Sequence, residues 1–393
     1  NKAPIHALMD KFANWYIVFT VVGSLVVYLL SQDIHLVLSL LLVSCADDIA
    51  IATPLALMSA ITHSVKHGAV IKGGNFLEGL AKTKTIIFDK TGTLTLGKLK
   101  IENIFSFNQK SNDKILELAA ITSLHSSHPI ARAIVNHAKE KSIFIDEPDN
   151  FEEYSGRGMS AFYKGKEIII GKLSFFQDLK IKINQQQLFE IKKAMQNGIN
   201  ATLIACGREL IGFVSLIDGL RPKTKEAVEE LKKLGVEETI MLTGDNEQVA
   251  QRISKEIGID KFHSDLLPKD KLEYYKKYSN KEYKVAMVGD GVNDAPVLAL
   301  ADIGIAMGAI GSDAAIEAAD IVMMKDDLSQ IPELIKIGRS ALKVIHQNLL
   351  MWMVLNILGF SLVFLHILDP SGAAAYNFIT DFIPILNSLR LFR

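Results

Sequence analysis

Asp89 is the residue whose type and position most directly suggest chemistry in this sequence. Residues 85–88 predict a short buried strand, and Asp89 follows it directly. In open α/β sheets, functional residues lie at the carboxyl ends of the strands. A carboxylate placed there can attack a phosphorus atom and form an aspartyl phosphate. Lys90 and the backbone amides after it are expected to face the incoming phosphoryl oxygens.

Position 91 determines how long such an adduct would last. Hydrolases of this general fold tend to carry a second aspartate two residues after the nucleophile, where it acts as acid and base. This sequence has Thr91 at that position, and a threonine hydroxyl cannot do that work at neutral pH. We therefore expect an acyl phosphate on Asp89 to persist long enough to drive another process.

Two polar loops farther along the chain are predicted to lie at the same edge of the sheet as Asp89. Each follows a stretch that predicts a strand, and the carboxyl ends of parallel strands meet at one edge. A single Gly-Asp-Gly stretch is usually only a turn, whereas three loops at one edge favour a functional site. The loop residues expected there are Thr243, Gly244 and Asp245 after residues 239–242, and Asp290 and Asn293 after residues 284–288.

The acidic residues of these loops predict a magnesium site. Mg²⁺ prefers a few hard oxygen ligands and keeps several waters. We expect Asp89 and Asp290 to be carboxylate ligands and the carbonyl of Thr91 to be a third ligand, with Asp294 and Asn293 in support. Lys271 can place its ammonium group on the transferred phosphoryl group.

The stretch DKTGTLT at 89–95 resembles the phosphorylation signature of the P-type ATPases. Other elements of that family follow in order: DGLRP from Asp218, TGD from Thr243 and MVGDGVNDAP from Met287. The resemblance implies ATP-driven cation transport in which ATP, with Mg²⁺, phosphorylates Asp89. By the same resemblance, Thr243 and Asp245 contact phosphate and nucleotide, Lys271 contacts the phosphate, and Asp290 binds Mg²⁺.

Residues 99–216 predict an inserted domain that is expected to bind ATP. A His-Pro pair and a Gly-Arg-Gly stretch resemble the nucleotide domain of the heavy-metal (type IB) P-type ATPases. A histidine ring can stack on adenine, and glycines let the backbone approach a ligand closely. The sequence departs from the subfamily at Ser123, where an acidic residue is usual, and at Lys172, where asparagine is usual. The expected nucleotide-binding residues are His128, Pro129, Gly156, Gly158 and Gly171.

Four apolar segments predict transmembrane helices arranged as two hairpins in a lipid bilayer. The hydrophobic share of 49% and the mean hydropathy of +0.22 are high for a soluble protein. Lysine and arginine flank the segments on the side shared with the polar region, which predicts that this region is cytoplasmic. The expected location is the plasma membrane. The segments are 12–32, 34–65, 344–368 and 370–389.

Acidic residues inside these segments predict a site for the transported ion. A charge at the centre of a membrane helix costs at least about 2.5–3.5 kcal/mol, so a functional role is expected. The heavy-metal subfamily usually carries Cys-Pro-Cys before Ala-Thr-Pro, whereas Cys-Ala-Asp precedes Ala-Thr-Pro here. One thiolate with several carboxylates favours a divalent ion such as Zn²⁺, Co²⁺, Fe²⁺ or Mn²⁺ over Cu⁺. The expected ligands are Cys45, Asp47, Asp48 and Asp381.

The expected fold class combines membrane helical hairpins with a cytoplasmic α/β portion. That portion is expected to be a haloacid dehalogenase-like, doubly wound parallel sheet with an inserted α+β nucleotide-binding domain. The sequence contains no Thr-Gly-Glu, which the family carries in its actuator domain, so we expect a further N-terminal portion. The predicted parts are 1–84 (membrane), 85–98 and 217–338 (phosphorylation domain), 99–216 (nucleotide-binding domain) and 339–393 (membrane).

Two other functions remain open at this point. The chain could be a phosphatase or phosphotransferase tethered to a membrane, although Thr91 and the acids within apolar segments favour a pump. It could also be a metal sensor derived from a pump, because the metal-binding motif is altered. The net charge of −1 gives no indication of nucleic-acid binding. The metal, the oligomeric state and the direction of transport are not determined by the sequence.

Overall fold

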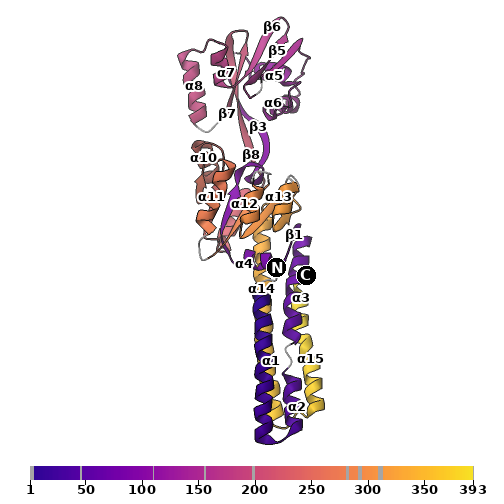
Figure 1. Ribbon diagram of the computed structural model, residues 1–393. Helices are drawn as coiled ribbons and strands as arrows, with labels where there is room; N and C mark the ends of the chain where they lie inside the picture. Colours follow the sequence, from indigo (N-terminus) through magenta and orange to yellow (C-terminus); the bar gives the residue numbers. More distant parts are fainter. Residues whose placement is uncertain are drawn as a thin grey trace. The chain divides into compact units, whose positions relative to one another are not determined.

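The computed structural model describes residues 4–44, 47–108, 110–154, 156–196, 200–279, 283–290, 294–308 and 313–392 of the chain. Among these residues it contains long apolar helices and two β-sheets (Figure 1). The chain divides into two compact units, and each is described by itself below. The first comprises Asn1–Ile87, Glu226–Thr239 and Leu272–Arg393, and the second comprises Phe88–Lys225 and Ile240–Lys271.

The first unit contains long helices with many exposed apolar side chains. Phe19 and Leu30 on α1 are 75% and 83% exposed, as expected for residues that face lipid. Within the described residues, three stretches are long and apolar enough to cross a membrane: Asn14–Ser31, Ile34–Lys66 and Gln330–Phe364. The helices are α1 (Pro4–Ser31), α2 (Ile34–Val43), α3 (Asp47–Lys66), α14 (Gln330–Phe364) and α15 (Pro370–Leu389).

The predicted membrane segments differ from these helices in two ways. The predicted segment 34–65 is divided between α2 and α3, and Asp47 is the first residue of α3. The predicted fourth segment does form α15, which is 20 residues long. However, α15 is not among the stretches apolar enough to span a membrane, because polar residues such as Asn377 and Asp381 lie along it.

A mostly parallel seven-stranded sheet has the order β1-β13-β12-β11-β2-β9-β10. Ile86, Ile87 and Phe88 of the central strand β2 are at most 1% exposed, as is typical of a parallel strand covered on both faces. The predicted doubly wound sheet is therefore confirmed, with the antiparallel β1 as an added edge strand. The strands are β1 (Ala69–Ile71), β2 (Thr83–Asp89), β9 (Glu238–Leu242), β10 (Lys261–His263), β11 (Lys284–Gly289), β12 (Ile303–Met307) and β13 (Ile321–Met323).

Helices alternate with the strands of this sheet along the chain. Three of them begin close to the polar stretches named above: α10 follows the TGD loop, α11 begins three residues before Lys271, and α12 follows the second acidic loop. The remaining helices lie between consecutive strands along the chain. The helices are α4 (Gly74–Ala81), α9 (Thr224–Lys233), α10 (Glu247–Ile257), α11 (Pro268–Ser279), α12 (Ala295–Leu300) and α13 (Asp313–Ala318).

The second sheet is antiparallel and has the order β3-β8-β7-β6-β5-β4. Alternate residues of β6 face opposite sides: Ile168 and Ile170 pack with α5 and α6, whereas Ile169 packs with α7 and α8. The predicted inserted α+β domain is confirmed. Its strands are β3 (Thr95–Ser106), β4 (Asn150–Tyr154), β5 (Gly158–Tyr163), β6 (Lys166–Gly171), β7 (Asn200–Cys206) and β8 (Glu209–Leu220). Its helices are α5 (Asn112–Ser123), α6 (Pro129–Glu140), α7 (Leu173–Asp178) and α8 (Gln185–Gln196).

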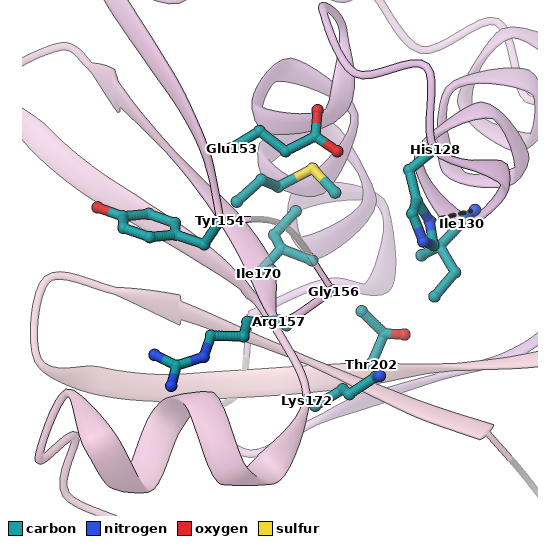
Figure 2. Close-up of a pocket in the computed structure, with 12 residues that line it drawn as sticks. His128, Ile130, Glu153, Tyr154, Gly156, Arg157, Ile170, Lys172 and Thr202 are labelled. Carbon is teal, nitrogen blue, oxygen red and sulfur yellow. Dashed lines mark hydrogen bonds between the residues drawn. The ribbon is translucent and has the colours of Figure 1, made fainter.

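Two features of this second sheet bear on function. The start of α6 and the facing ends of β5 and β6 line a pocket (Figure 2). The strands β3 and β8 are each 12 residues long and are paired along most of their length. The predicted boundaries at 98/99 and 216/217 therefore fall inside these strands.

Candidate active site

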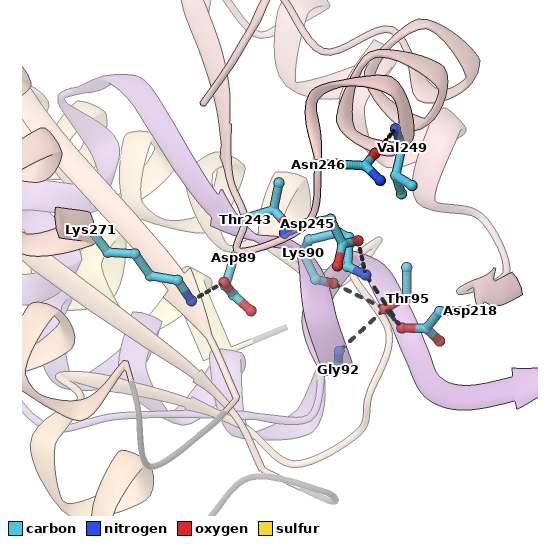
Figure 3. Close-up of polar contacts among 10 residues, drawn as sticks. All are labelled: Asp89, Lys90, Gly92, Thr95, Asp218, Thr243, Asp245, Asn246, Val249 and Lys271. Carbon is cyan, nitrogen blue, oxygen red and sulfur yellow. Dashed lines mark hydrogen bonds and ion pairs between the residues drawn. The ribbon is translucent and has the colours of Figure 1, made fainter. Parts of the chain in front are cut away.

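Asp89 is the last residue of β2 and is only 3% exposed. The ammonium group of Lys271, itself 8% exposed, forms an ion pair with its carboxylate (Figure 3). Lys271 lies in the first turn of α11, where the carboxylate of Asp270 accepts the backbone N–H of Leu267 at 2.8 Å. The cap fixes the start of the helix, and with it the position of the lysine. Two residues singled out from the sequence thus form a buried ion pair.

The loop that follows Asp89, Lys90–Leu94, makes a sharp turn. Gly92 adopts φ = 75°, which glycine reaches without steric cost. Arg221 is 4% exposed and donates from Nε to the carbonyl oxygen of Thr93 at 2.9 Å and from its guanidinium to that of Gly92. A buried guanidinium therefore holds the backbone of the loop that carries Thr91.

Lys90 does not point toward the position beside Asp89 that the sequence suggested. Its ammonium lies 2.6 Å from the Asp245 carboxylate and 3.9 Å from that of Asp218. Thr243, predicted to act with Asp245, accepts the backbone N–H of that residue on its hydroxyl at 3.1 Å. The two acidic residues neutralise Lys90, and Lys271 is the cation that pairs with Asp89.

Sequence reasoning assigned no role to three residues of this network, which are Asp218, Arg221 and Thr95. The Thr95 hydroxyl donates to Asp218 at 2.5 Å and to the carbonyl oxygen of Lys90 at 3.1 Å. The signal was present, because Asp218 and Arg221 belong to the DGLRP stretch, but a motif alone does not reveal which groups its members contact. Gly244 lies close to the backbone of Leu266. A Cβ added at position 244 would lie 3.2 Å from the Leu266 carbonyl oxygen.

A group of three carboxylates could hold a metal ion. Ligand oxygens of Asp89, Asp290 and Asp294 lie within 4.8 Å of one another. Carboxylate oxygens are hard donors, so this set fits Mg²⁺. Asp294 is buried and begins α12, whereas Asp290 is half-buried. The predicted supporting residue Asn293 lies outside the described residues.

The predicted nucleotide-binding residues gather around one pocket of the second sheet (Figure 2). His128 is the N-cap of α6, and its Nδ1 accepts the backbone N–H of Ile130 at 3.2 Å. A neutral imidazole that accepts at Nδ1 carries its proton on Nε2, so the ring offers a hydrogen-bond donor. Pro129 occupies the first turn of α6. The lining residues are His128, Ile130, Glu153, Tyr154, Gly156, Arg157, Gly158, Met159, Ile170, Gly171, Lys172 and Thr202.

The three predicted glycines serve different purposes in this pocket. Gly156 has φ = 72° and forms a turn that other residues adopt with strain. Gly158 and Gly171 are cross-strand partners, and a Cβ on Gly171 would lie 2.7 Å from the carbonyl oxygen of Arg157. These two glycines line the pocket, where the sequence predicts close approach to a ligand, and they also allow close approach of two strands.

Comparisons with known proteins agree with this geometry. Residues 83–302 match the family model described as haloacid dehalogenase-like hydrolase. The whole chain is similar to a manganese-exporting P-type ATPase of Mycobacterium leprae (34% identity) and a cadmium-transporting ATPase of Staphylococcus aureus (36% identity). It covers 54% and 56% of those proteins. The structure resembles that of a zinc-transporting PIB-type ATPase in the E2.Pi state (TM-score 0.89, 32% identity), covering 98% of this chain and 64% of the other.

The chain belongs to the haloacid dehalogenase-like hydrolases, as a homologue of the heavy-metal P-type ATPases. The resemblance stated from its motifs is confirmed. The chain spans about half the length of the curated relatives it matches. Its parallel sheet carries the phosphorylation motif of these ATPases at the end of β2.

The predicted ion ligands of this P-type ATPase homologue are described only in part. Asp48 in α3 is 6% exposed, and Asp381 in α15 is half-buried and 3.4 Å from the side-chain nitrogen of Asn377. Cys45 and the side chain of Asp47 lie outside the described residues. Pro54, the proline of the Ala-Thr-Pro stretch, lies within α3.

A hydrogen-bonded chain ties these membrane helices together. Asn348 of α14 donates to the Ser388 hydroxyl at 2.8 Å, and that hydroxyl donates to the Ala52 carbonyl oxygen of α3 at 2.9 Å. Asn387 donates to the Asn348 side chain at 2.7 Å. Asn387 thus takes part in a helix-to-helix contact. The network positions α3, which carries Asp48, against α14 and α15.

Proposed function

We propose that this chain forms the phosphorylation, nucleotide-binding and part of the membrane machinery of an ATP-driven exporter of a divalent transition-metal cation. The observation that carries the proposal is the buried Asp89–Lys271 pair at the end of β2, with Thr91 two residues after the nucleophile. A nucleophile without a nearby acid-base aspartate forms a phosphoenzyme more readily than it hydrolyses one.

In the proposed reaction, a carboxylate oxygen of Asp89 attacks the γ-phosphorus of ATP. The new bond joins that oxygen to phosphorus, the bond between the γ-phosphorus and the bridging oxygen breaks, and ADP leaves with the bonding electron pair. Lys271 then exchanges part of its contact with the carboxylate for the transferred phosphoryl oxygens, where negative charge develops. The Arg221 contacts keep the loop backbone in place for this step.

Asp89, Asp290 and Asp294 are the proposed carboxylates of the magnesium site, with the Thr91 carbonyl as a further ligand. Their donor set supports this assignment, because three carboxylates suit a hard divalent cation. Bound Mg²⁺ neutralises phosphoryl charge and acts as a Lewis acid. Asp245 and Thr243 are proposed to hold Lys90 and shape the loop beside the phosphate.

The pocket at the start of α6 is proposed to bind the adenosine part of ATP. The exposed His128 ring, fixed by its cap hydrogen bond, supports this assignment, as do the backbone groups between Gly156 and Gly158. The exchange of ATP and ADP requires an open site, and both the ring and the turn are accessible.

Cys45, Asp47, Asp48 and Asp381 are proposed to bind the transported ion. The burial of Asp48 in an apolar helix supports it, because a charge inside such a helix is costly and therefore favours a functional role. The similar proteins are named for manganese, cadmium and zinc, all of which form divalent ions. A site with one thiolate and several carboxylates also favours a divalent ion. We propose a plasma-membrane location with the two sheets in the cytoplasm and outward transport.

The test is phosphorylation by γ-labelled ATP and Mg²⁺. The chain is expected to form an acid-stable, hydroxylamine-sensitive adduct that Asp89→Asn abolishes. Asp113→Asn, a change of the same kind at an exposed position of α5, should leave the adduct intact. No adduct on the unmodified chain, or an undiminished adduct in Asp89→Asn, would refute the proposal. Metal stimulation of turnover in the presence of the remaining domains, lost in Asp48→Ala and Asp381→Ala, would distinguish a pump from a tethered phosphatase.

A further inference from the structure

A second cavity lies beside the phosphoacceptor loop, in the same compact unit as Asp89. Its volume is about 230 Å³, and its lining includes Lys90 and Thr91, the two residues that follow the nucleophile. The other polar residues of its wall are Asp218, Asp245 and Arg252. Because Thr91 is exposed, a ligand in this cavity can reach the loop that follows Asp89.

Arg252 is the cation of this wall that is most available to a ligand. Lys90 is already held 2.6 Å from Asp245 and is buried, whereas the Arg252 guanidinium lies 3.9 Å from the Glu102 carboxylate. The side chains of Arg252 and Glu102 are 35% and 33% exposed. An ion pair that loose and that accessible contributes little to stability, so the guanidinium can change partner at small cost.

The position of Arg252 follows from helix α10. Asn246 caps the helix by accepting the Val249 N–H at 2.9 Å (Figure 3). Arg252 and Ile253 lie three and four residues after Val249, so both share with it the helix face that lines the cavity. Arg252 belongs to none of the motifs that identified the family.

The wall also presents a hydrogen-bond acceptor. One carboxylate oxygen of Asp218 accepts from Thr95, but the other, Oδ1, is buried and has no hydrogen-bond partner among the described residues. Such an oxygen is costly to leave unsatisfied, so a donor from a ligand would stabilise it. A cation and an acceptor in one cavity suit a ligand that carries both anionic oxygens and hydroxyl groups.

We propose that Arg252 binds the polyphosphate of the nucleotide while its terminal phosphoryl group is transferred to Asp89. The guanidinium offers a planar pair of N–H groups, which matches two phosphate oxygens. Asp218 Oδ1 accepts a hydroxyl of the same ligand. The inference rests on the proposed function and adds a positioning residue to it, since Arg252 acts on the nucleotide and not on the phosphoryl acceptor.

The experiment compares two phosphoryl donors, ATP and acetyl phosphate, in forming the Asp89 adduct. Arg252→Ala is expected to raise the apparent KM for ATP about tenfold with little change in kcat, because one charge-assisted contact to the nucleotide is lost. Adduct formation from acetyl phosphate, which has no polyphosphate, should not change. Arg252→Lys should recover part of the ATP affinity, because it keeps the charge without the planar fork.

Two controls separate binding from structure. Lys255→Ala removes an exposed cation from the same helix and should leave both KM values unchanged. Glu102→Ala removes the present partner of Arg252 and should leave the KM for ATP unchanged or lower it. An equal KM for ATP in Arg252→Ala, or the same increase in Glu102→Ala, would overturn the inference. If the unmodified chain forms no adduct from either donor, the proposed function fails instead.

Discussion

In and around the loop after Asp89 the charged side chains are buried and paired, whereas the pocket at the start of α6 is shaped mostly by backbone and by exposed side chains. Asp89 and Lys271 are 3% and 8% exposed and contact each other, and Arg221 holds the loop carbonyls. In the pocket, His128 is exposed and Gly158 and Gly171 bring two strands together. Charged groups that are held in place away from water interact strongly with the charge that develops in a transition state, and they need not reorganise during the reaction. This arrangement suits the formation of a covalent bond. An accessible pocket suits a ligand that must exchange.

The largest expected effect is the loss of Lys271. Lys271→Ala removes the cation at the nucleophile, and we expect the rate of phosphorylation by ATP to fall by about 10²–10³-fold, as for one preorganised donor in other active sites. Rapid-quench measurement of the labelled adduct tests this. Lys276→Ala, at the other end of α11, serves as the control. A rate within threefold of the unmodified chain would mean that the buried pair is structural only.

A smaller effect is expected from closing the space between the two cross-strand glycines. Gly171→Ala would place a Cβ 2.7 Å from the Arg157 carbonyl oxygen and 2.8 Å from the Phe175 ring. We expect a loss of roughly 1–3 kcal/mol of stability in the inserted domain, together with weaker ATP binding. Thermal unfolding and nucleotide titration measure both. Gly219→Ala in β8, with its nearest atom at 3.8 Å, should be tolerated. Equal stability in the two variants would contradict the packing argument.

Replacing His128 sharpens the comparison from the side of the pocket. His128→Ala removes both the ring and the cap, and we expect the dissociation constant for ATP to rise about tenfold and the domain to lose about 1 kcal/mol. His128→Asn keeps a capping oxygen but removes the ring. If asparagine restores stability and not ATP affinity, the ring contacts the nucleotide. Full recovery of affinity would show that the cap alone matters.

The smallest expected effect concerns Asp320, a carboxylate held by a backbone amide and not by a buried lysine. Burial raises the pKa of Asp320 above 3.8, although its Oδ2 accepts the Gly304 N–H at 2.9 Å and Lys72 lies nearby. Between the two pKa values the native state holds more protons than the unfolded chain, so the free energy of unfolding falls as pH rises through that interval. Asp320→Asn should flatten this slope in thermal unfolding at pH 4 to 6. An unchanged slope would exclude Asp320 as its source.

Part of this arrangement could be predicted from the sequence, and part could not. Asp89 and Lys271 were assigned because a buried apolar stretch locates the strand end and the motifs fix the order of the loops. The partner of Lys90 was not predictable, because it depends on how the loop that begins at Lys90 lies against the loop after β9, whose Asp245 carboxylate is 2.6 Å from the Lys90 ammonium. Arg221 was missed because its hydrogen-bond acceptors are backbone carbonyl oxygens. Every residue carries such an oxygen, so the residue types do not indicate this contact.

The elements show the same division. Strands of strong β character, such as β2 and β9, were predicted nearly to the residue, whereas β4 and β5 mix polar and apolar residues and were missed. The start of α14 was also misplaced. Its first turns bear charged residues such as Glu333 and Lys336, so they resemble a separate soluble helix. Only continuity of the backbone shows that one helix contains both parts.

That continuity makes α14 a stiff rod. Its 35 residues at about 1.5 Å each extend about 52 Å, whereas the apolar core of a bilayer is about 30 Å thick. Near the N-terminus of α14, Lys336 forms an ion pair with Glu230 at 2.5 Å, and Arg339 donates to the Ala81 carbonyl oxygen at 3.2 Å. A force or torque applied near Lys336 would be transmitted to Asn348 and its hydrogen-bonded neighbours, because the helix is continuous between them.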